Sequence, residues 1–276
     1  MLTKTRRLIP VLLAGMLLVP LAGPAMADDP IVRGPSEPVT SDALRQAELD
    51  LVTLTNSKRA ARGLVALRID PDIMSIARDR AEVMAANDVM SHEEPNGQKV
   101  FDRIRAAGLV WYAAGEIIAW NNYPMEYSPA EAISAWMASP GHKAIMISTG
   151  YNYVGYGAAE SATGKMYYAG VFLKERDETG AWAKFRTISK QRVSAGRVRV
   201  TIRWSGADTR LQVLTAGFRY FEVQRRRVGG TWHSWGTTTA TSRSVTWLRA
   251  YDREVRVRAR DKAGNWGSWR VIRINL

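Results

Sequence analysis

The stretch SPAEAISAWMASPGH at residues 128–142 contains a predicted helix with a histidine just behind it. Ser128 at the cap, Pro next to it and Glu131 at the third helical position form a capping-box pattern. Trp136 lies one helical repeat after Ile133, so both predict an inward face, and the helix should run from Ser128 to Ala138. His142 follows, and because the chain has only three histidines, it is the first candidate for a functional site.

A second histidine, His92, ends the run Met90-Ser91-His92 behind another predicted helix, and an isolated acid, Glu116, lies between the two histidines. Neutral imidazole is the commonest biological metal ligand, and a carboxylate can complete such a site. We therefore predict a divalent metal site, with zinc preferred, formed by His92, His142 and Glu116. The alternative is that each histidine is a structural residue at a helix end, near a backbone carbonyl.

Helical and strand patterns surround these residues. Helical periodicity begins at Ser41 and should end near Gly63, Asp70-Pro71 is typical of a second helix start, and residues 98–107 predict a third helix. Tyr153 to Ala158 and Lys165 to Leu173 predict two antiparallel strands joined by a turn at residues 162–164. Helices on either side of a small antiparallel sheet give an α/β/α sandwich.

The last part of the chain alternates with a period of two residues. In residues 197–204 and again in 255–260, valine, isoleucine, alanine and tryptophan occupy one face and arginines the other. Such short strands predict an all-β sandwich of about 90 residues. Two similar runs, WHSW at 232–235 and WGSW at 266–269, supply tryptophans on which arginines can stack at the surface. The alternative function of these tryptophans is a carbohydrate- or lipid-binding strip.

The first 27 residues have the pattern of a cleavable signal peptide. A charged start precedes an apolar run from Leu8 to Ala22, and Ala25-Met26-Ala27 is a small-x-small cleavage pattern. The alternative, an uncleaved membrane anchor, is disfavoured because proline and glycine interrupt a short run. Residues 28–40 are rich in proline and predict a linker. We expect a secreted protein, extracellular or associated with the cell envelope.

Charge and cysteine content restrict the function classes. The chain has no cysteine, which excludes disulfides, thiolate zinc sites and cysteine nucleophiles. Residues 186–276 carry 20 Lys+Arg against 5 Asp+Glu, a net charge of +15, whereas residues 28–185 carry −5. Outside the cell, the partner expected for the basic part is an anionic envelope polymer or a lipid surface, and no nucleic acid is expected. The alternative is a basic face that only keeps the domain soluble.

Several short motifs occur in an order that identifies a family. They are Asn56-Ser57-Lys58-Arg59, Ser91-His92, Gly115-Glu116, Ser128-Pro129 with Trp136, Ser139-Pro140-Gly141-His142, and Tyr153-Val154-Gly155-Tyr156-Gly157. Together they resemble the CAP superfamily (cysteine-rich secretory, antigen 5 and pathogenesis-related proteins) in its compact bacterial form, the SCP domain. The resemblance spans about Ala43 to Lys174 and implies the CAP-type α/β/α sandwich.

The resemblance also implies the residues of a groove. The family's cavity histidines fall on His92 and His142, and its first cavity acid falls on Glu116; many members bind a divalent metal there. The family's Gly-Glu-Asn is Gly115-Glu116-Ile117 here, and its second cavity acid falls on Ser139. Two histidines and one acid remain, which leaves an open coordination position for ligand binding or hydrolysis.

The last domain resembles a fibronectin type III-like sandwich of bacterial surface proteins through Arg256 to Asn265. The expected fold class is therefore α+β, with a CAP domain at 41–175, a linker at 176–190 and an all-β, immunoglobulin- or fibronectin-like sandwich at 191–276. The position of the corner tyrosine near Arg253 departs from the family, since Tyr251 lies two residues earlier.

Three functions are compatible with the sequence. The first is a non-catalytic binding protein whose groove (His92, Glu116, His142 and Ser139) takes a divalent metal or a small apolar ligand. The second is a metal-dependent hydrolase of peptide or cell-wall polymer, which would need a separate base. Glu93 and Glu94 are near in sequence but are expected to be solvated loop charges. The third is an adhesin or scaffold with a vestigial pocket.

Overall fold

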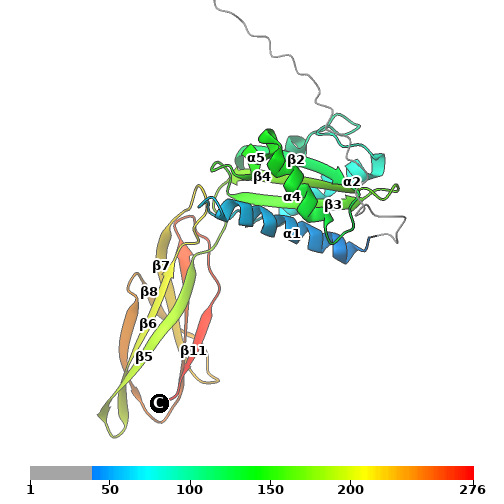
Figure 1. The fold of residues 1–276 in the computed structure, drawn as a ribbon. Coiled ribbons are helices and arrows are strands. Elements are labelled where there is room, and N and C mark those ends of the chain that lie inside the picture. Colours follow the sequence, from blue (N-terminus) through cyan, green and yellow to red (C-terminus); the bar gives the residue numbers. More distant parts are fainter. Residues whose placement is uncertain (1–38) are drawn as a thin grey trace, which may run out of the picture.

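The computed structural model describes residues 39–276, so the signal peptide and nearly all of the linker predicted at 28–40 lie outside the described residues. The described chain forms a mixed α/β domain followed by a β-sandwich (Figure 1). Among the described helices, none is long and apolar enough to span a bilayer.

The first domain is an α/β/α sandwich, as predicted. Its elements in chain order are α1 (Ser41–Ala60), β1 (Arg68–Ile69), α2 (Pro71–Asn87), α3 (Val100–Ala106), β2 (Trp111–Asn121), α4 (Ser128–Ala138), α5 (Pro140–Met146), β3 (Tyr153–Glu160) and β4 (Met166–Glu175). The sheet order is β1-β3-β4-β2. Only the short β1 pairs in parallel, with β3; β3, β4 and β2 are antiparallel.

Each face of this sheet buries a separate core. On one face, Leu51 of α1 and Trp136 of α4 pack against the sheet residues Tyr156 and Phe172. On the other face, α2 and α3 pack with Val171 and Leu173. Gly157 permits this second layer, because a Cβ there would lie 2.1 Å from the Ala77 carbonyl oxygen of α2. The two cores hold the helices on opposite sides of one sheet (Figure 1).

Local details of the prediction needed correction. The helix at 128–138 has the predicted bounds, but its N-cap is Tyr127, and Ser128 is a buried first helical residue. The Ser128 hydroxyl lies 2.6 Å from Asn121 Oδ1 and 2.6 Å from the Tyr168 hydroxyl. The hydroxyl bonds to the sheet instead of capping the helix, so the capping-box interpretation was wrong.

The second domain is a sandwich of two antiparallel sheets. Its strands are β5 (Trp182–Ser194), β6 (Arg197–Ala207), β7 (Phe218–Arg227), β8 (His233–Thr238), β9 (Ser242–Leu248), β10 (Arg253–Asp261) and β11 (Arg270–Ile274). The sheet orders are β11-β10-β7-β8 and β5-β6-β9. Val200 and Trp204 of one sheet and Phe221 and Val257 of the other share the core. An all-β sandwich is confirmed; the fibronectin-like subfamily stays a prediction.

The linker prediction at 176–190 was wrong in its second half, because β5 begins at Trp182. This strand lies at the edge of its sheet and pairs only with β6, and most of its residues are exposed. An edge strand needs few apolar residues, so its polar composition resembled that of a linker. The connection between the domains is therefore shorter than expected.

The stacking of arginines on indole rings is confirmed. The Arg256 guanidinium lies 4.3 Å from the Trp269 ring centroid, and that of Arg258 lies 3.9 Å from the Trp266 centroid. Arg260 also stacks over Trp266, at 5.0 Å. The outer face of β10 is thus covered by alternating arginine and tryptophan side chains.

The segment between β6 and β7 docks on the CAP-like domain. Leu211 is buried among the α2-side core residues. The Gln212 Oε1 accepts hydrogen bonds from the Val65 amide (2.8 Å) and from Arg59 Nη2 (3.3 Å). The sandwich therefore contacts the first domain at one end, and its other end carries the C-terminus (Figure 1).

Candidate functional site

Strand β2 carries Glu116 into the interior. The strand is buried from Gly115 through Ala119, and the Glu116 side chain is 3% exposed. Sequence reasoning did not predict this strand, since an apolar run without alternation does not distinguish a buried strand from a helix. A buried carboxylate requires partners, and Glu116 has two.

Both oxygens of Glu116 are occupied. Oε1 accepts a 2.8 Å bond from Arg80 Nε, and Oε2 lies 2.7 Å from His92 Nδ1. A carboxylate only accepts, so this contact requires the proton of His92 on Nδ1. The arrangement fixes the ring and leaves Nε2 of His92 to face a ligand, on a side chain that is 56% exposed.

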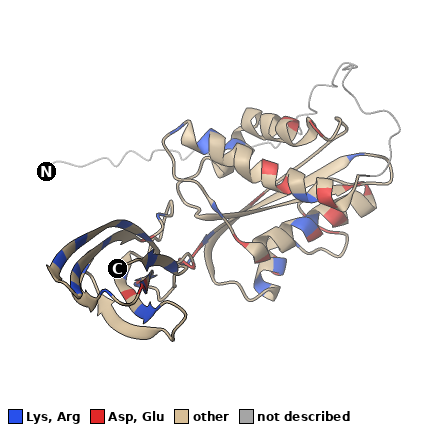
Figure 2. Cartoon of the chain, turned by 90° about the horizontal axis from the view of Figure 1, so that it is seen from below, with Lys and Arg blue, Asp and Glu red and all other residues tan. Residues whose placement is uncertain are grey.

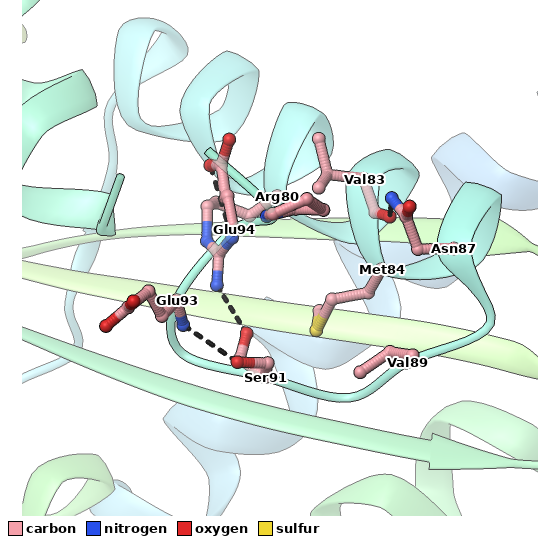
Figure 3. A pocket seen from close by; sticks show the side chains of 9 residues that line it. Arg80, Val83, Met84, Asn87, Val89, Ser91, Glu93 and Glu94 are labelled. Atoms are coloured by element: carbon pink, nitrogen blue, oxygen red, sulfur yellow. Dashed lines mark hydrogen bonds and ion pairs between the residues drawn. The ribbon is translucent and has the colours of Figure 1, made fainter. Parts of the chain in front are cut away.

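Arg80 of α2 connects the parts of the site. It is fully buried, and its Nη2 donates to the Ser91 carbonyl oxygen at 2.7 Å (Figure 3). Its Nη1 lies 3.2 Å from Glu94. One guanidinium therefore holds the carboxylate of β2 and the loop that carries His92.

Glu94 belongs to the same network, contrary to the expectation of a solvated loop charge. Its side chain is 3% exposed and accepts two bonds from Arg103, at 2.6 and 3.0 Å. These bonds lower the pKa of Glu94, despite the opposing effect of burial. A buried ion-pair network therefore holds the loop between α2 and α3 against the domain.

His142 lies in the short helix α5, which sequence reasoning also missed. Its pKa is lowered, first by burial and then by the charge of His92. The imidazole of His142 is thus partly buried, and the charge of His92 acts against its protonation. Ser139 is the N-cap residue of α5, but its side chain makes no capping bond.

The predicted three-ligand set is not assembled as one cluster. Within residues 39–276, only Asp177, Asp208 and Asp261 form a group of three metal-ligating side chains with ligand atoms within 4.8 Å of one another. His92, Glu116 and His142 do not: His92 Nδ1 and Glu116 Oε2 meet at 2.7 Å, but the His142 ring nitrogens do not come within this range of both. The donors that remain are His92 Nε2 and His142, with Glu116 supporting His92 from behind.

A small hollow lies beside the site, at the Arg80 end. It has a volume of about 340 Å³ and is lined by Val83, Met84, Val89, Pro95 and polar neighbours (Figure 3). A carrier of a lipid-like apolar ligand needs a long apolar groove. This hollow is short, and charged groups form part of its wall.

Sequence reasoning missed Arg80, Glu94 and Arg103 as site residues. A signal for Arg80 was present, because it lies four residues after Ile76 and four before Met84, on the apolar stripe of α2. A charged residue in the middle of a buried stripe requires a buried partner of opposite charge.

Comparisons with known proteins agree with this fold. Residues 52–172 match the CAP family, described as the cysteine-rich secretory protein family. The uncharacterized protein YkwD of Bacillus subtilis is 31% identical over 116 residues, which is 42% of this chain and 44% of that protein. The uncharacterized membrane protein YlbC of the same organism is 29% identical over 46% of this chain and 34% of its own length.

Two solved structures are also similar. An extracellular SCP-domain protein from Bacillus anthracis is 24% identical with a TM-score of 0.44, covering 51% of this chain and 45% of that one. An outer surface protein from Borrelia burgdorferi is 19% identical with a TM-score of 0.43, covering 51% and 98%. The chain spans less than half the length of the curated relatives it matches. From the family match and the α/β/α fold, the first domain of this chain belongs to the CAP family.

Proposed function

We propose that this chain is a secreted, non-catalytic binding protein and that its CAP domain binds a divalent metal ion through His92 and His142. The observation that carries the proposal is the bond between Glu116 and Nδ1 of His92. A carboxylate behind an imidazole is the usual support of a metal-binding histidine, since it fixes the tautomer and makes the outer nitrogen more basic.

The electrostatics of the pair support a metal over an organic cation. The lowered pKa of His142 keeps this imidazole neutral near pH 7, the form that binds metal. Two nitrogen donors fit zinc and leave further positions open. When bound, such an ion would supply a Lewis-acidic centre that recognises oxygen or nitrogen donors of a ligand.

The environment favours binding over hydrolysis. Glu94 is committed to Arg80 and Arg103, and the exposed Glu93 lies 3.6 Å from Lys99. The Ser91 hydroxyl oxygen accepts a 3.0 Å hydrogen bond from the backbone amide of Glu93. A hydrolase needs a general base within reach of the attacking water, and these acids are bound elsewhere or exposed on the loop.

The signal-peptide pattern and the basic sandwich give this binding protein a location. Export followed by attachment of the +15 domain to an anionic envelope polymer would hold the CAP domain at the cell surface. Figure 2 shows lysines and arginines along the strands of the sandwich, in contrast to the mixed charges of the CAP domain.

Calorimetric titration of residues 28–276 with zinc tests the metal proposal. We expect one-to-one binding that is lost in His92→Ala/His142→Ala and unchanged in His233→Ala, which removes the histidine of β8. Glu116→Gln should weaken binding about 10- to 100-fold. Unaltered zinc binding in the double variant, or no binding in the parent protein, would overturn the proposal and leave an apolar-ligand carrier or a scaffold.

A further inference from the structure

Three arginines lie on the inner face of the sandwich at the end of its strands. Phe221 and Val223 of β7 are buried, and Arg225 and Arg227 follow at alternate positions on the same side. Arg253 opens β10 two residues before the buried Val255. Because side chains alternate across a strand, all three arginines continue the core-facing rows.

The strand register brings these arginines together. Arg253 is paired with Arg227, Val255 is paired with Arg225, and His233 of β8 is the other neighbour of Arg225. Like charges directly opposite each other destabilise a sheet. Arg227 is exposed, and Arg225 and Arg253 are partly buried, so solvent screens this repulsion only in part and an anion at this end of the sandwich would relieve it.

No carboxylate compensates them within the part of the chain that the structure describes. Arg226, which faces the other way, has its Nε 2.6 Å from Glu254, but the structure gives Arg225, Arg227 and Arg253 no side-chain hydrogen bond or ion pair. Nη1 of Arg253 is buried without a partner. Burial lowers the pKa of Arg253, and the charges of Arg227 and Arg225 lower it further.

Aromatic rings hold the guanidinium groups in place of acids. Arg227 lies 4.2 Å from the Tyr251 ring centroid, Arg225 lies 5.0 Å from that of Trp235, and Arg253 lies 5.9 Å from that of Trp247. Stacking orients a guanidinium but does not neutralise it. The donors are therefore positioned while their charge stays unbalanced.

A cavity of about 320 Å³ opens between these side chains. Its lining is Arg225, Arg226, Arg227, His233, Trp247 and Arg253. Arg253 is paired with Ile274, so the cavity lies at the end of the sandwich that carries the C-terminus, away from the CAP domain (Figure 1). The volume is at the lower end of the range for small-molecule sites.

We propose that this cavity is an oxyanion site for the phosphoryl group of a small phosphate ester or of a phosphate-bearing polymer unit. Guanidinium groups match the geometry of phosphate oxygens, which the two N–H groups of one arginine can bind together. A phosphate monoester also carries about 1.5 to 2 negative charges near pH 7, so it balances three arginines better than a carboxylate does. Trp247 is the aromatic residue of the lining, against which the group that carries the phosphate would pack. The inference rests on the part of the proposed function in which the basic sandwich attaches the protein to an anionic envelope polymer, and it names the anionic group as a phosphate. It does not depend on metal binding by His92 and His142.

Calorimetry with glycerol 3-phosphate tests the site in phosphate-free buffer. We expect saturable one-to-one binding that weakens at least 10-fold in Arg253→Gln and in Arg225→Gln/Arg227→Gln. Arg253→Lys keeps the positive charge but loses the paired N–H donors of the guanidinium, so this variant should bind glycerol 3-phosphate with intermediate affinity. Arg199→Gln is the matched control, because it removes the same charge from the exposed outer face of β6. Thermal unfolding of each variant confirms that it is folded.

The outcomes separate the pocket from general basicity. If Arg199→Gln and Arg253→Gln weakened the binding of glycerol 3-phosphate equally, the pocket proposal would be overturned. Binding would then reflect the general positive charge of the sandwich. No binding of glycerol 3-phosphate to the parent protein would overturn the pocket. If the parent protein also failed to bind a polymer of glycerol phosphate, the proposal that the sandwich attaches to an anionic polymer of this kind would be overturned as well.

Vesicle sedimentation identifies the source of the phosphate. Binding to vesicles of phosphatidic acid and phosphatidylcholine, lost in Arg253→Gln but not in Arg199→Gln, would assign a lipid headgroup to the pocket. Binding of glycerol 3-phosphate without vesicle binding would assign a soluble or polymeric ester. Either result supports the site.

Discussion

Arg80 in the CAP domain and Arg253 in the sandwich are both arginines with buried guanidinium atoms, but their surroundings are opposite. Arg80 contacts two buried carboxylates, Glu116 and Glu94, and a backbone carbonyl. Arg253 lies beside two more arginines. Nη1 of both Arg80 and Arg253 is buried without a hydrogen-bond partner, but that of Arg80 lies 3.2 Å from the Glu94 carboxylate, whereas the described residues place no acid at ion-pair distance from Arg253. Removing one partner of a buried ion pair is strongly destabilising. A buried charge with no acid beside it is costly unless a group from outside the chain pairs with it.

The same difference extends to the two domains. In the CAP domain the buried acids beside Arg80 are paired within the chain, and the exposed His92 side chain is supported by one of them. The sandwich carries 20 Lys+Arg against 5 Asp+Glu in residues 186–276, so most of its positive charge has no internal acid to pair with. We infer that the CAP domain presents a small ligand site on a self-sufficient scaffold, while the sandwich depends on an external anion.

Among the substitutions, the largest loss of stability is expected from removing the partnered arginine. Arg80→Gln leaves Glu94 with Arg103 alone and Glu116 with His92 alone, and it places a neutral amide between two buried acids, so the free energy of unfolding should fall by about 3 kcal/mol. Urea unfolding followed by tryptophan fluorescence measures the loss. His92 should also lose its fixed orientation, which would weaken zinc binding in whatever fraction stays folded.

Arg78→Gln is the control for this prediction. Arg78 lies on the same helix and also pairs with a buried acid, Glu48, but it is itself partly exposed and Glu48 keeps a second partner in Arg45. Its loss should cost about 1 kcal/mol. A similar cost for Arg78→Gln and Arg80→Gln would show that Arg80 has no special role in fastening the site.

Much of the fold could be predicted, because helix boundaries and strand alternation leave local signals. Asp70 caps α2 with its side chain, and the arginine-lined strands have the expected bounds to within a few residues. Strand β2 was not predicted because packing on both faces buries its centre, although it is an edge strand that pairs with β4, and its sequence therefore lacks alternation. His92 and Glu116 were found through their motifs, whereas their connection through Arg80 depends on packing between distant segments.

The cavity lined by Arg225, Arg227 and Arg253 could not be predicted for a similar reason. Alternation in 255–260 correctly placed Arg256, Arg258 and Arg260 on the face opposite the buried core residues. The run Arg225-Arg226-Arg227 does not by itself show which arginines face the core, since three consecutive residues of a strand occupy both of its faces. Only the pairing of Arg227 with Arg253 fixes which of them turn inward.

Glu175 extends the comparison to a buried acid without a partner. Its side chain is buried, Oε1 makes no hydrogen bond, and burial, with the nearby Asp70, raises its pKa to about 8. Between pH 4.5 and 8 the folded state therefore keeps a proton that the unfolded chain releases. This contribution to stability is complete below pH 4.5 and is lost as the pH rises through 8.

Glu175→Gln should remove this dependence. We expect the parent protein to lose about 3 to 4 kcal/mol of unfolding free energy between pH 5 and pH 8 from this group, and the variant to show a flatter profile. Urea unfolding at both pH values measures the difference. A parallel profile for the parent protein and the variant would show that Glu175 titrates normally in the folded state.

The smallest expected effect, and the sharpest contrast with Arg80, is that of Arg253→Gln on stability without phosphate. Removing this charge relieves repulsion with Arg227 and Arg225 and breaks no ion pair, so the unfolding free energy should change by less than about 0.5 kcal/mol, or rise. Arg226→Gln, which loses the bond to Glu254, should cost more. Adding glycerol 3-phosphate should then stabilise the parent protein but not Arg253→Gln, because only a state that binds the ligand gains from it. A loss above about 2 kcal/mol in phosphate-free buffer would mean that Arg253 is structural after all, and its buried nitrogen would no longer indicate an external anion.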